Sequence, residues 1–288
     1  MAQIQNAHLI RRAAMASIAT ALILLVAKTF AWAASDSASI LSSLLDSLMD
    51  ITASVVNFFA IRYALTPADD DHPFGHTKAE GLAALLQSGF ILGSAGMLLL
   101  HVSERLINPR PIDDVGLGIG VMAFSTIATI TLVMYQRWVA ARTSSLAIKA
   151  DSAHYLGDIL TSAAVVLALI ASKMEVYWLD PLVAVLIAVV LIWSAVGILR
   201  ESFRILMDSA MAEEDEKTII DMITATQGIH GFHDLRTRQS GVLQFIQFHI
   251  DMNGQQSLRQ AHDIGDALEH RIRDRFPQAE VIVHYDPV

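Results

Sequence analysis

The chain has 288 residues, of which 53% are hydrophobic, and a formal net charge of -9. This hydrophobic share is too high for an ordinary soluble domain, and the acidic balance disfavours a nucleic-acid partner. The sequence contains no cysteine. Disulfides and thiolate metal sites are therefore excluded, and any transition-metal site must use His, Asp and Glu side chains.

Six stretches are long and apolar enough to be expected as membrane-spanning helices, which need roughly 20 mostly apolar residues. They lie at about 13–34, 38–64, 80–103, 114–136, 145–172 and 178–200. The first does not resemble a cleaved signal, because no clear cleavage site follows it. Arg and Lys residues gather at one set of segment ends, so we expect both termini in the cytoplasm. The loops 34–38, 104–113 and 173–180 are then expected on the opposite side.

The composition changes after Arg204, and we expect a membrane domain at 1–208 followed by a soluble domain at 209–288. Residues 213–226 predict an amphipathic helix, and 232–250 predict two strands joined by a Ser-Gly turn. Ser257 is a plausible N-cap for a second helix, and residues 279–288 predict a final strand. The order α-β-β-α-β favours a small α+β domain with two helices on one face of a three-stranded sheet.

Two aspartates, Asp46 and Asp50, lie four residues apart in the second segment and therefore share one helix face. Each charged group near the bilayer centre costs about 2.5–3.5 kcal/mol on insertion scales, so the pair requires a partner. The fifth segment supplies His154 and Asp158, which are also four apart. These segments are predicted to run antiparallel. Three carboxylates and one imidazole then suit a tetrahedral site for a divalent ion such as Zn²⁺.

A purely structural explanation of these polar residues is also open. An intramembrane aspartate is often paired with lysine, and Lys28 in the first segment is available for that purpose. Asp151 is compatible with a position at the membrane interface. The combination of DxxxD on one helix with HxxxD on another favours the metal site over this explanation.

Two further groups of ligand residues lie outside the predicted spans. Asp69, His72 and His76 form a D-x-x-H-x-x-x-H cluster in the loop after the second segment. A solvated acidic loop is the alternative there, because three ligands without a cage bind weakly. In the soluble domain, a site for one or two ions is expected from a set of strand and helix residues: His233, His249, His262, His284 and Asp286.

Several long motifs resemble the cation diffusion facilitator family. They are SLLDSLMD, FFAIRYALTPADDDHPFGHTKAEGLAALLQS, ADSAHYLGD, and GFHDLRTRQSG followed by FIQFHI. The resemblance covers nearly the whole chain. One departure is Asp70, where relatives often carry His; the loop is more acidic for it, which leaves its metal preference open.

The resemblance implies a homodimer of six-helix protomers in a bacterial inner membrane, each with a metallochaperone-like cytoplasmic domain. It implies a transport site at Asp46, Asp50, His154 and Asp158, a loop site at Asp69, His72 and His76, and a binuclear site at the five cytoplasmic-domain residues. It also implies a charge interlock between Lys78 and Asp208. The expected activity is export of Zn²⁺, Fe²⁺ or Cd²⁺ in exchange for protons, with Zn²⁺ also in a structural or regulatory role.

Two other functions are less well supported by the sequence. An intramembrane metallohydrolase would need an open metal position and a general base, and the chain has no HExxH motif. We therefore do not expect an enzyme. A membrane-anchored metal sensor without transport activity would leave four ligands in the bilayer unexplained.

Overall fold

The computed structural model describes residues 2–35, 38–107, 118–173 and 178–288, in two compact units, Met1–Ser202 and Phe203–Val288. This division falls a few residues before the boundary expected at 208. The connections expected at 34–38, 104–113 and 173–180 lie wholly or partly outside the described residues.

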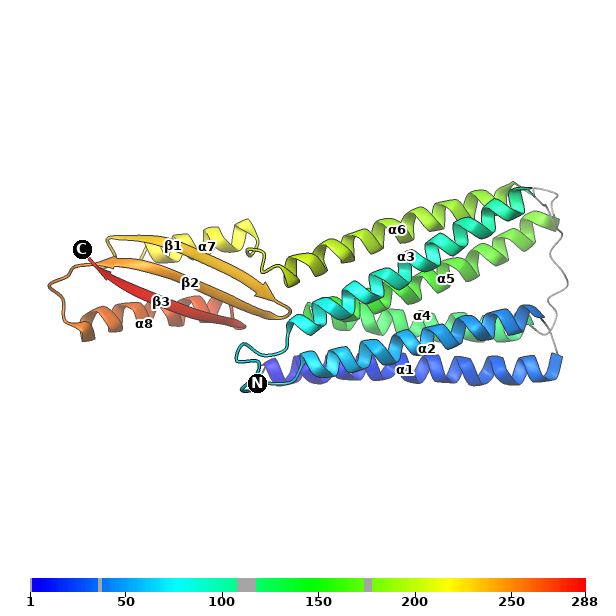
Figure 1. The fold of residues 1–288 in the computed structure, drawn as a ribbon, viewed down its shortest axis with the longest axis horizontal. Coiled ribbons are helices and arrows are strands. Elements are labelled where there is room, and N and C mark those ends of the chain that lie inside the picture. The colour runs from blue at the N-terminus through cyan, green and yellow to red at the C-terminus, as the bar shows by residue number, and fades with distance from the viewer. Residues whose placement is uncertain (1, 36–37, 108–117, 174–177) are drawn as a thin grey trace. The chain divides into compact units, whose positions relative to one another are not determined.

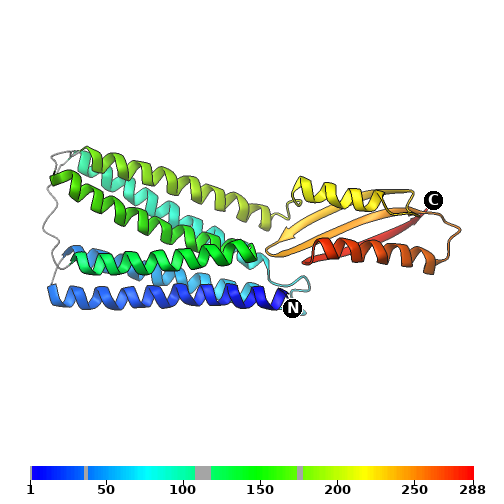
Figure 2. The same ribbon diagram turned by 180° about the vertical axis from the view of Figure 1, so that it is seen from behind.

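The first unit is a bundle of long helices that run side by side (Figures 1 and 2). Their bounds are α1 (Ala2–Ser35), α2 (Ala38–Ala64), α3 (Lys78–Ile107), α4 (Gly118–Thr143), α5 (Leu146–Lys173) and α6 (Leu179–Leu206). Within the described residues, four of them are long and apolar enough to cross a membrane: α1, α2, α3 and α6. For α4 and α5 the expected membrane crossing stays a prediction.

Many large apolar side chains of the bundle lie on its outer surface, and several polar side chains are buried inside it, unlike in an ordinary soluble protein. Phe30, Met97 and Trp193 are 73%, 69% and 80% exposed. In contrast, Gln136 on α4 and Asp151 on α5 are fully buried. Polar groups in a membrane protein are placed where other protein groups, and not lipid, surround them.

The second unit contains α7 (Glu213–Thr224), β1 (Gly231–Ser240), β2 (Leu243–Met252), α8 (Leu258–Arg275) and β3 (Ala279–Pro287). The strands form one sheet in the order β1-β2-β3, with β1 antiparallel and β3 parallel to β2. The expected α-β-β-α-β order is confirmed. Ser257 caps α8 through a reciprocal capping box with Gln260, also as predicted.

Both helices of this unit cover one face of the sheet. Alternate residues of β2, such as Phe248 and Ile250, are buried in a core with Ile219 and Ile223 of α7 and with residues of α8. Because side chains alternate across a strand, the residues between them point to the other face. His249 lies on that second face, which no helix of this unit covers, and it is only partly buried.

Candidate metal centres

The intramembrane residues singled out in the sequence come together from α2 and α5. Asp50, His154 and Asp158 each offer one ligand atom, and these atoms all lie within 4.8 Å of one another. The Nε2 atom of His154 is 3.2 Å from Oδ1 of Asp50. His154 is 8% exposed, so this contact is shielded from solvent. Tyr155 anchors the same stretch of α5, because its hydroxyl lies 2.7 Å from that of Ser54 on α2.

Asp46 does not belong to this close group. It lies one turn before Asp50 on α2, and its side chain is exposed on the bundle surface. Three of the four ligands expected from the sequence therefore converge in the described structure. The role of Asp46 as the fourth ligand stays a prediction, which requires its side chain to turn toward the other three.

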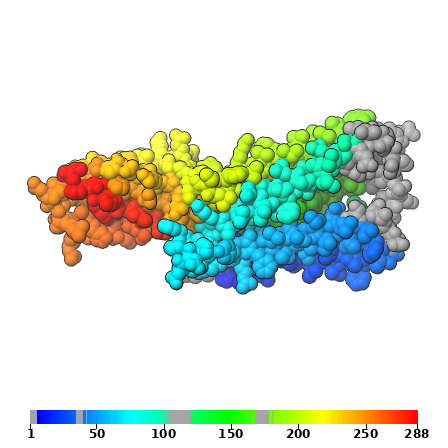
Figure 3. Space-filling model, in the orientation of Figure 1, coloured from blue at the N-terminus to red at the C-terminus, as the bar shows by residue number. Residues whose placement is uncertain are grey.

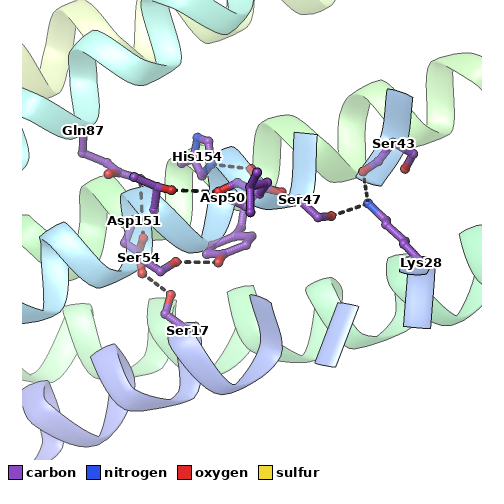
Figure 4. A network of polar contacts seen from close by, with 12 residues as sticks. Ser17, Lys28, Ser43, Ser47, Asp50, Ser54, Gln87, Asp151 and His154 are labelled. Carbon is purple, nitrogen blue, oxygen red and sulfur yellow. Dashed lines mark hydrogen bonds and ion pairs between the residues drawn. The ribbon is translucent and has the colours of Figure 1, made fainter. Parts of the chain in front are cut away.

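Two further charged residues flank this group on opposite sides (Figure 4). On one side, Lys28 of α1 donates hydrogen bonds to the Ser43 carbonyl at 3.1 Å and the Ser47 hydroxyl at 2.6 Å. The structural explanation would have Lys28 pair directly with an aspartate. Its two hydrogen-bond acceptors are instead both uncharged. On the other side lies Asp151, one turn before His154.

Asp151 is not an interfacial residue; it is fully buried at the centre of a polar cluster that joins four helices. Its Oδ2 accepts hydrogen bonds from Ser17 of α1 and Gln136 of α4, each at 2.5 Å. Its Oδ1 accepts a longer bond of 3.4 Å from Gln87 of α3. This cluster was not predicted from the sequence. The available signal was that several apolar segments each contain a polar residue. The sequence does not show that these residues lie at the same depth in the bundle, because that depends on how the helices pack.

The loop between α2 and α3 brings together all three of its predicted ligands, Asp69, His72 and His76. Oδ1 of Asp69 is 3.2 Å from Nδ1 of His72, and its Oδ2 is 3.4 Å from Nε2 of His76. Gly75 adopts a positive φ of 77°, which a glycine tolerates without strain and which lets the loop turn back. Figure 3 shows this loop, in cyan, on the surface at one end of α2 and α3.

Hydrogen bonds orient the ligand side chains of this loop, which a solvated acidic turn would not require. His76 is buried, and its Nδ1 lies 3.3 Å from the Thr66 carbonyl, so its Nε2 faces Asp69. Orientation of a histidine by its second ring nitrogen is common in metal sites. The backbone N–H of His72 donates to Asp69 at 2.7 Å, and this bond is the main cause that lowers the pKa of the exposed Asp69 carboxyl.

A third group lies on the open face of the sheet in the second unit. The strand register places His233 opposite His249 and His249 opposite His284, so the three rings form a row across β1, β2 and β3. Asp286 joins this row. Its Oδ2 is 2.9 Å from Nδ1 of His249 and 3.3 Å from Nε2 of His233, and its Oδ1 is 3.4 Å from Nε2 of His284. The hydrogen bond from His249 is the main cause that lowers the pKa of Asp286.

This sheet group differs from the predicted set in three residues. His262 lies exposed on α8, on the helical side of the sheet, and no close ligand group within the described residues includes it. Two aspartates join instead. Oδ1 of Asp251 is 3.5 Å from Nε2 of His233, and Oδ2 of Asp234 is 3.7 Å from Nδ1 of the same ring. Asp251 was not predicted from the sequence, although a spacing of two from His249 places both on one strand face.

The predicted interlock pairs residues from different units, so it stays a prediction. Within the second unit, Asp208 forms a salt bridge with Arg238, with Nη1 and Oδ1 3.0 Å apart.

Comparisons with known proteins give the following matches. The model of the cation efflux transmembrane domain matches residues 14–207, and that of the cation efflux protein cytoplasmic domain matches residues 211–288. The cation-efflux pumps FieF of Salmonella typhimurium (strain LT2) and Salmonella arizonae are each 46% identical over 280 residues, covering 97% of this chain and 93% of the relative.

Among solved structures, similarity is found to the metal-bound C-terminal domain of the CzcD transporter from Thermotoga maritima. It has 23% identity and a TM-score of 0.26, covering 27% of this chain and 94% of that one. The zinc form of the putative zinc transporter CzrB has 27% identity and a TM-score of 0.25, covering 28% and 92%.

Proposed function

This chain belongs to the cation diffusion facilitator family, whose members are cation-efflux transporters, and we propose that it exports divalent transition-metal cations from the cytoplasm in exchange for protons. The proposed cargo is Zn²⁺, Fe²⁺ or Cd²⁺, the proposed location is a bacterial inner membrane, and the proposed active form is a homodimer.

One observation carries this proposal: two carboxylates and an imidazole from α2 and α5 converge inside a bundle whose outer surface is apolar. A mixed oxygen and nitrogen ligand set is suited to Zn²⁺ and similar divalent ions. A group of this kind between membrane helices marks an ion pathway more often than a structural feature. The position of the group, away from either end of its helices, favours transport over binding at the membrane surface.

The same ligands supply a reason for proton exchange. A metal-ligating imidazole and carboxylate must be deprotonated, so a bound metal ion and a proton on these atoms exclude one another. The contact between Nε2 of His154 and Oδ1 of Asp50 is one that a shared proton can bridge when no metal is bound. We propose that the site takes metal from the cytoplasm and releases it on the opposite side, where protons replace it, by alternating access.

The other two groups are proposed to serve this transport. The loop site at Asp69, His72 and His76 joins α2 to α3 directly, so an ion there constrains both helices where they end. The sheet site at His233, His249, His284 and Asp286 is proposed to bind structural or regulatory Zn²⁺. An ion held there would couple the cytoplasmic metal level to the geometry of this unit.

Metal uptake into proteoliposomes with an imposed pH gradient tests the proposal. Zn²⁺, Fe²⁺, Cd²⁺ and Mn²⁺ are assayed in parallel for the wild type and for Asp50→Ala. Thr52→Val is the matched control, because Thr52 lies on the same helix, is exposed, and bonds only to its own helix at the Leu48 carbonyl.

We expect gradient-driven flux in the wild type and in Thr52→Val, and none in Asp50→Ala. Full activity of Asp50→Ala would rule out this transport site. Absence of flux for every metal, with tight metal binding retained, would instead support a membrane-anchored sensor.

A further inference from the structure

Lys28 is a charged residue on an otherwise apolar stretch of α1, and the contacts of its ammonium are with α2. It donates to the Ser43 carbonyl and the Ser47 hydroxyl, at 3.1 and 2.6 Å. Ser47 is 1% exposed and stands between the two aspartates of α2 in the sequence. The ammonium is therefore held beside the candidate transport site, and the acceptors that hold it carry no charge.

The charge of Lys28 nevertheless acts on the carboxylates of that site. Its ammonium attracts the carboxylates of Asp46, Asp50 and Asp158, and Ser47, to which it donates, directly follows Asp46 on α2. Asp151, at the other side of the site, already accepts hydrogen bonds from its own cluster of Ser17, Gln87 and Gln136. Lys28 therefore belongs to the charge balance of the metal ligands and not to that of the Asp151 cluster.

A count of formal charges shows what this lysine does for the cargo. With Asp46 turned inward as the predicted fourth ligand, the carboxylates of Asp46, Asp50 and Asp158 contribute -3 when ionised, and Lys28 contributes +1. A divalent cation brings the total to -3 + 1 + 2 = 0. Without the lysine, the occupied site would keep a net charge of -1. Without the lysine, the ammonium would also no longer repel the cation, and the empty site would be more negative, so the site would hold the cation more tightly.

A purely structural role for Lys28 would not require a charge. An uncharged glutamine amide also donates two hydrogen bonds, and it could join α1 to Ser43 and Ser47. Lysine costs more than glutamine inside a membrane, because its desolvation is that of a full charge. The choice of lysine is thus explained by its effect on a neighbouring cation and not by its hydrogen bonds.

We propose that Lys28 is a fixed positive charge beside the transport site. With it, the site carries no net charge when one divalent cation is bound, and the cation is held weakly enough to be released. This inference rests on the proposed function, since it presumes that Asp50, His154 and Asp158 bind the cargo together with Asp46 as the predicted fourth ligand. Lys28 acts through electrostatics and is not itself a ligand.

The test is a measurement of Zn²⁺ affinity at the intramembrane site of the full chain in detergent micelles. Asp69→Ala and Asp286→Ala silence the other two sites, and a competing chelating indicator reports Kd. In this background the variants are Lys28→Gln and Lys28→Arg. Lys149→Gln is the matched control, because it removes the same charge from an exposed lysine that pairs with Glu201 at 2.6 Å.

We expect Lys28→Gln to bind Zn²⁺ at least about tenfold more tightly, at the lower end of the effect of one nearby charge on a neighbouring ionisation. Lys28→Arg and Lys149→Gln should stay near the wild-type Kd. In proteoliposomes, Lys28→Gln should also turn over more slowly, because release is impeded. A structural role cannot produce tighter binding, so the gain separates the two explanations.

An unchanged or weaker affinity in a Lys28→Gln protein that keeps its thermal stability and elution volume would overturn the proposal. Asp50→Ala in the same background distinguishes the two levels of inference. If Asp50→Ala abolishes the remaining Zn²⁺ binding, the transport site is supported, and the Lys28 variants then test only the role of Lys28. If binding persists in Asp50→Ala, the transport site itself is wrong, and the role proposed for Lys28 falls with it.

Discussion

The buried carboxylate of Asp151 permits a prediction about the stability of the bundle. Replacing Asp151 by alanine removes the acceptor for Ser17, Gln136 and Gln87, which lie on three other helices and are all 2% exposed or less. These donors would then lose that acceptor, and Gln136 would keep the Ser17 hydroxyl as a partner at 3.2 Å. We expect the bundle to lose stability, with the helix contacts around this cluster affected most.

The size of the loss follows from the three hydrogen bonds. Side-chain hydrogen bonds between membrane helices contribute about 0.6 kcal/mol on average and about 1.7 kcal/mol at most. The two bonds of 2.5 Å are placed near the upper value and the bond of 3.4 Å near or below the average. The sum is about 3–4 kcal/mol for Asp151→Ala.

Asp151→Asn is the matched control. Its amide oxygen can still accept from Ser17 and Gln136, and its NH₂ group can donate to Gln87 after that amide turns over. We therefore expect this variant to stay within about 1 kcal/mol of the wild type on the same hydrogen-bond scale.

The measurement is equilibrium unfolding in mixed micelles with increasing dodecyl sulfate, followed by tryptophan fluorescence. A loss below about 1 kcal/mol for Asp151→Ala would refute the reasoning, because it would mean that the three donors find other partners. An equal loss in both variants would refute it as well, since the charge and not the hydrogen bonds would then be responsible.

Three further predictions concern the ends of the bundle and the second unit. Because the hydrogen bond from His249 lowers the pKa of Asp286, this pair stabilises the unit above the ordinary carboxyl pKa of 3.8, and the contribution is lost as the pH falls through the lower folded-state value. The difference in melting temperature between wild type and Asp286→Asn should be constant near neutral pH and vanish in acid; a difference that grows in acid would contradict this sign. His249→Ala should weaken Zn²⁺ binding to this unit by at least about tenfold, because loss of even an outer-shell partner of a metal ligand costs about 10–100-fold. His270→Ala, on an exposed helix face, should leave a calorimetric titration unchanged. Glu80 accepts hydrogen bonds from the Ser145 hydroxyl and from the backbone at the start of α5. Glu80→Ala should therefore lower the stability of the bundle by about 1 kcal/mol, as does loss of a helix cap, and should speed hydrogen exchange in the first turn of α5. Exchange at the wild-type rate would show that the cap is dispensable.

Much of this architecture could be predicted because local patterns specify it. Long apolar stretches predicted the helices of the bundle, and alternation with a Ser-Gly turn predicted β1 and β2. Gly241 indeed adopts a positive φ of 59° in that turn. The loop cluster was also predictable, because its three ligands lie within eight residues of one another in the sequence.

Other features depended on contacts between segments that are distant in the sequence. A spacing of four placed Asp46 and Asp50 on one helix face, but only the packing of α2 against α5 shows that Asp50 meets His154 while Asp46 stays exposed. The same holds for Asp151, whose partners come from α1, α3 and α4. Helix periodicity states which residues share a face and does not state what that face meets.

The sheet site shows this division most clearly. Residue spacing in the sequence determined that His284 and Asp286 share one face of a strand. The strand register, which depends on hydrogen bonds between distant strands, decided that His233, His249 and His284 stand in one row. It also brought in Asp251, while the packing of α8 against the opposite face set His262 apart. The sequence by itself thus determined the kinds of ligand and their local faces, and the tertiary structure decided which of them meet, because a metal site is made by side chains from separate elements brought within a few ångströms.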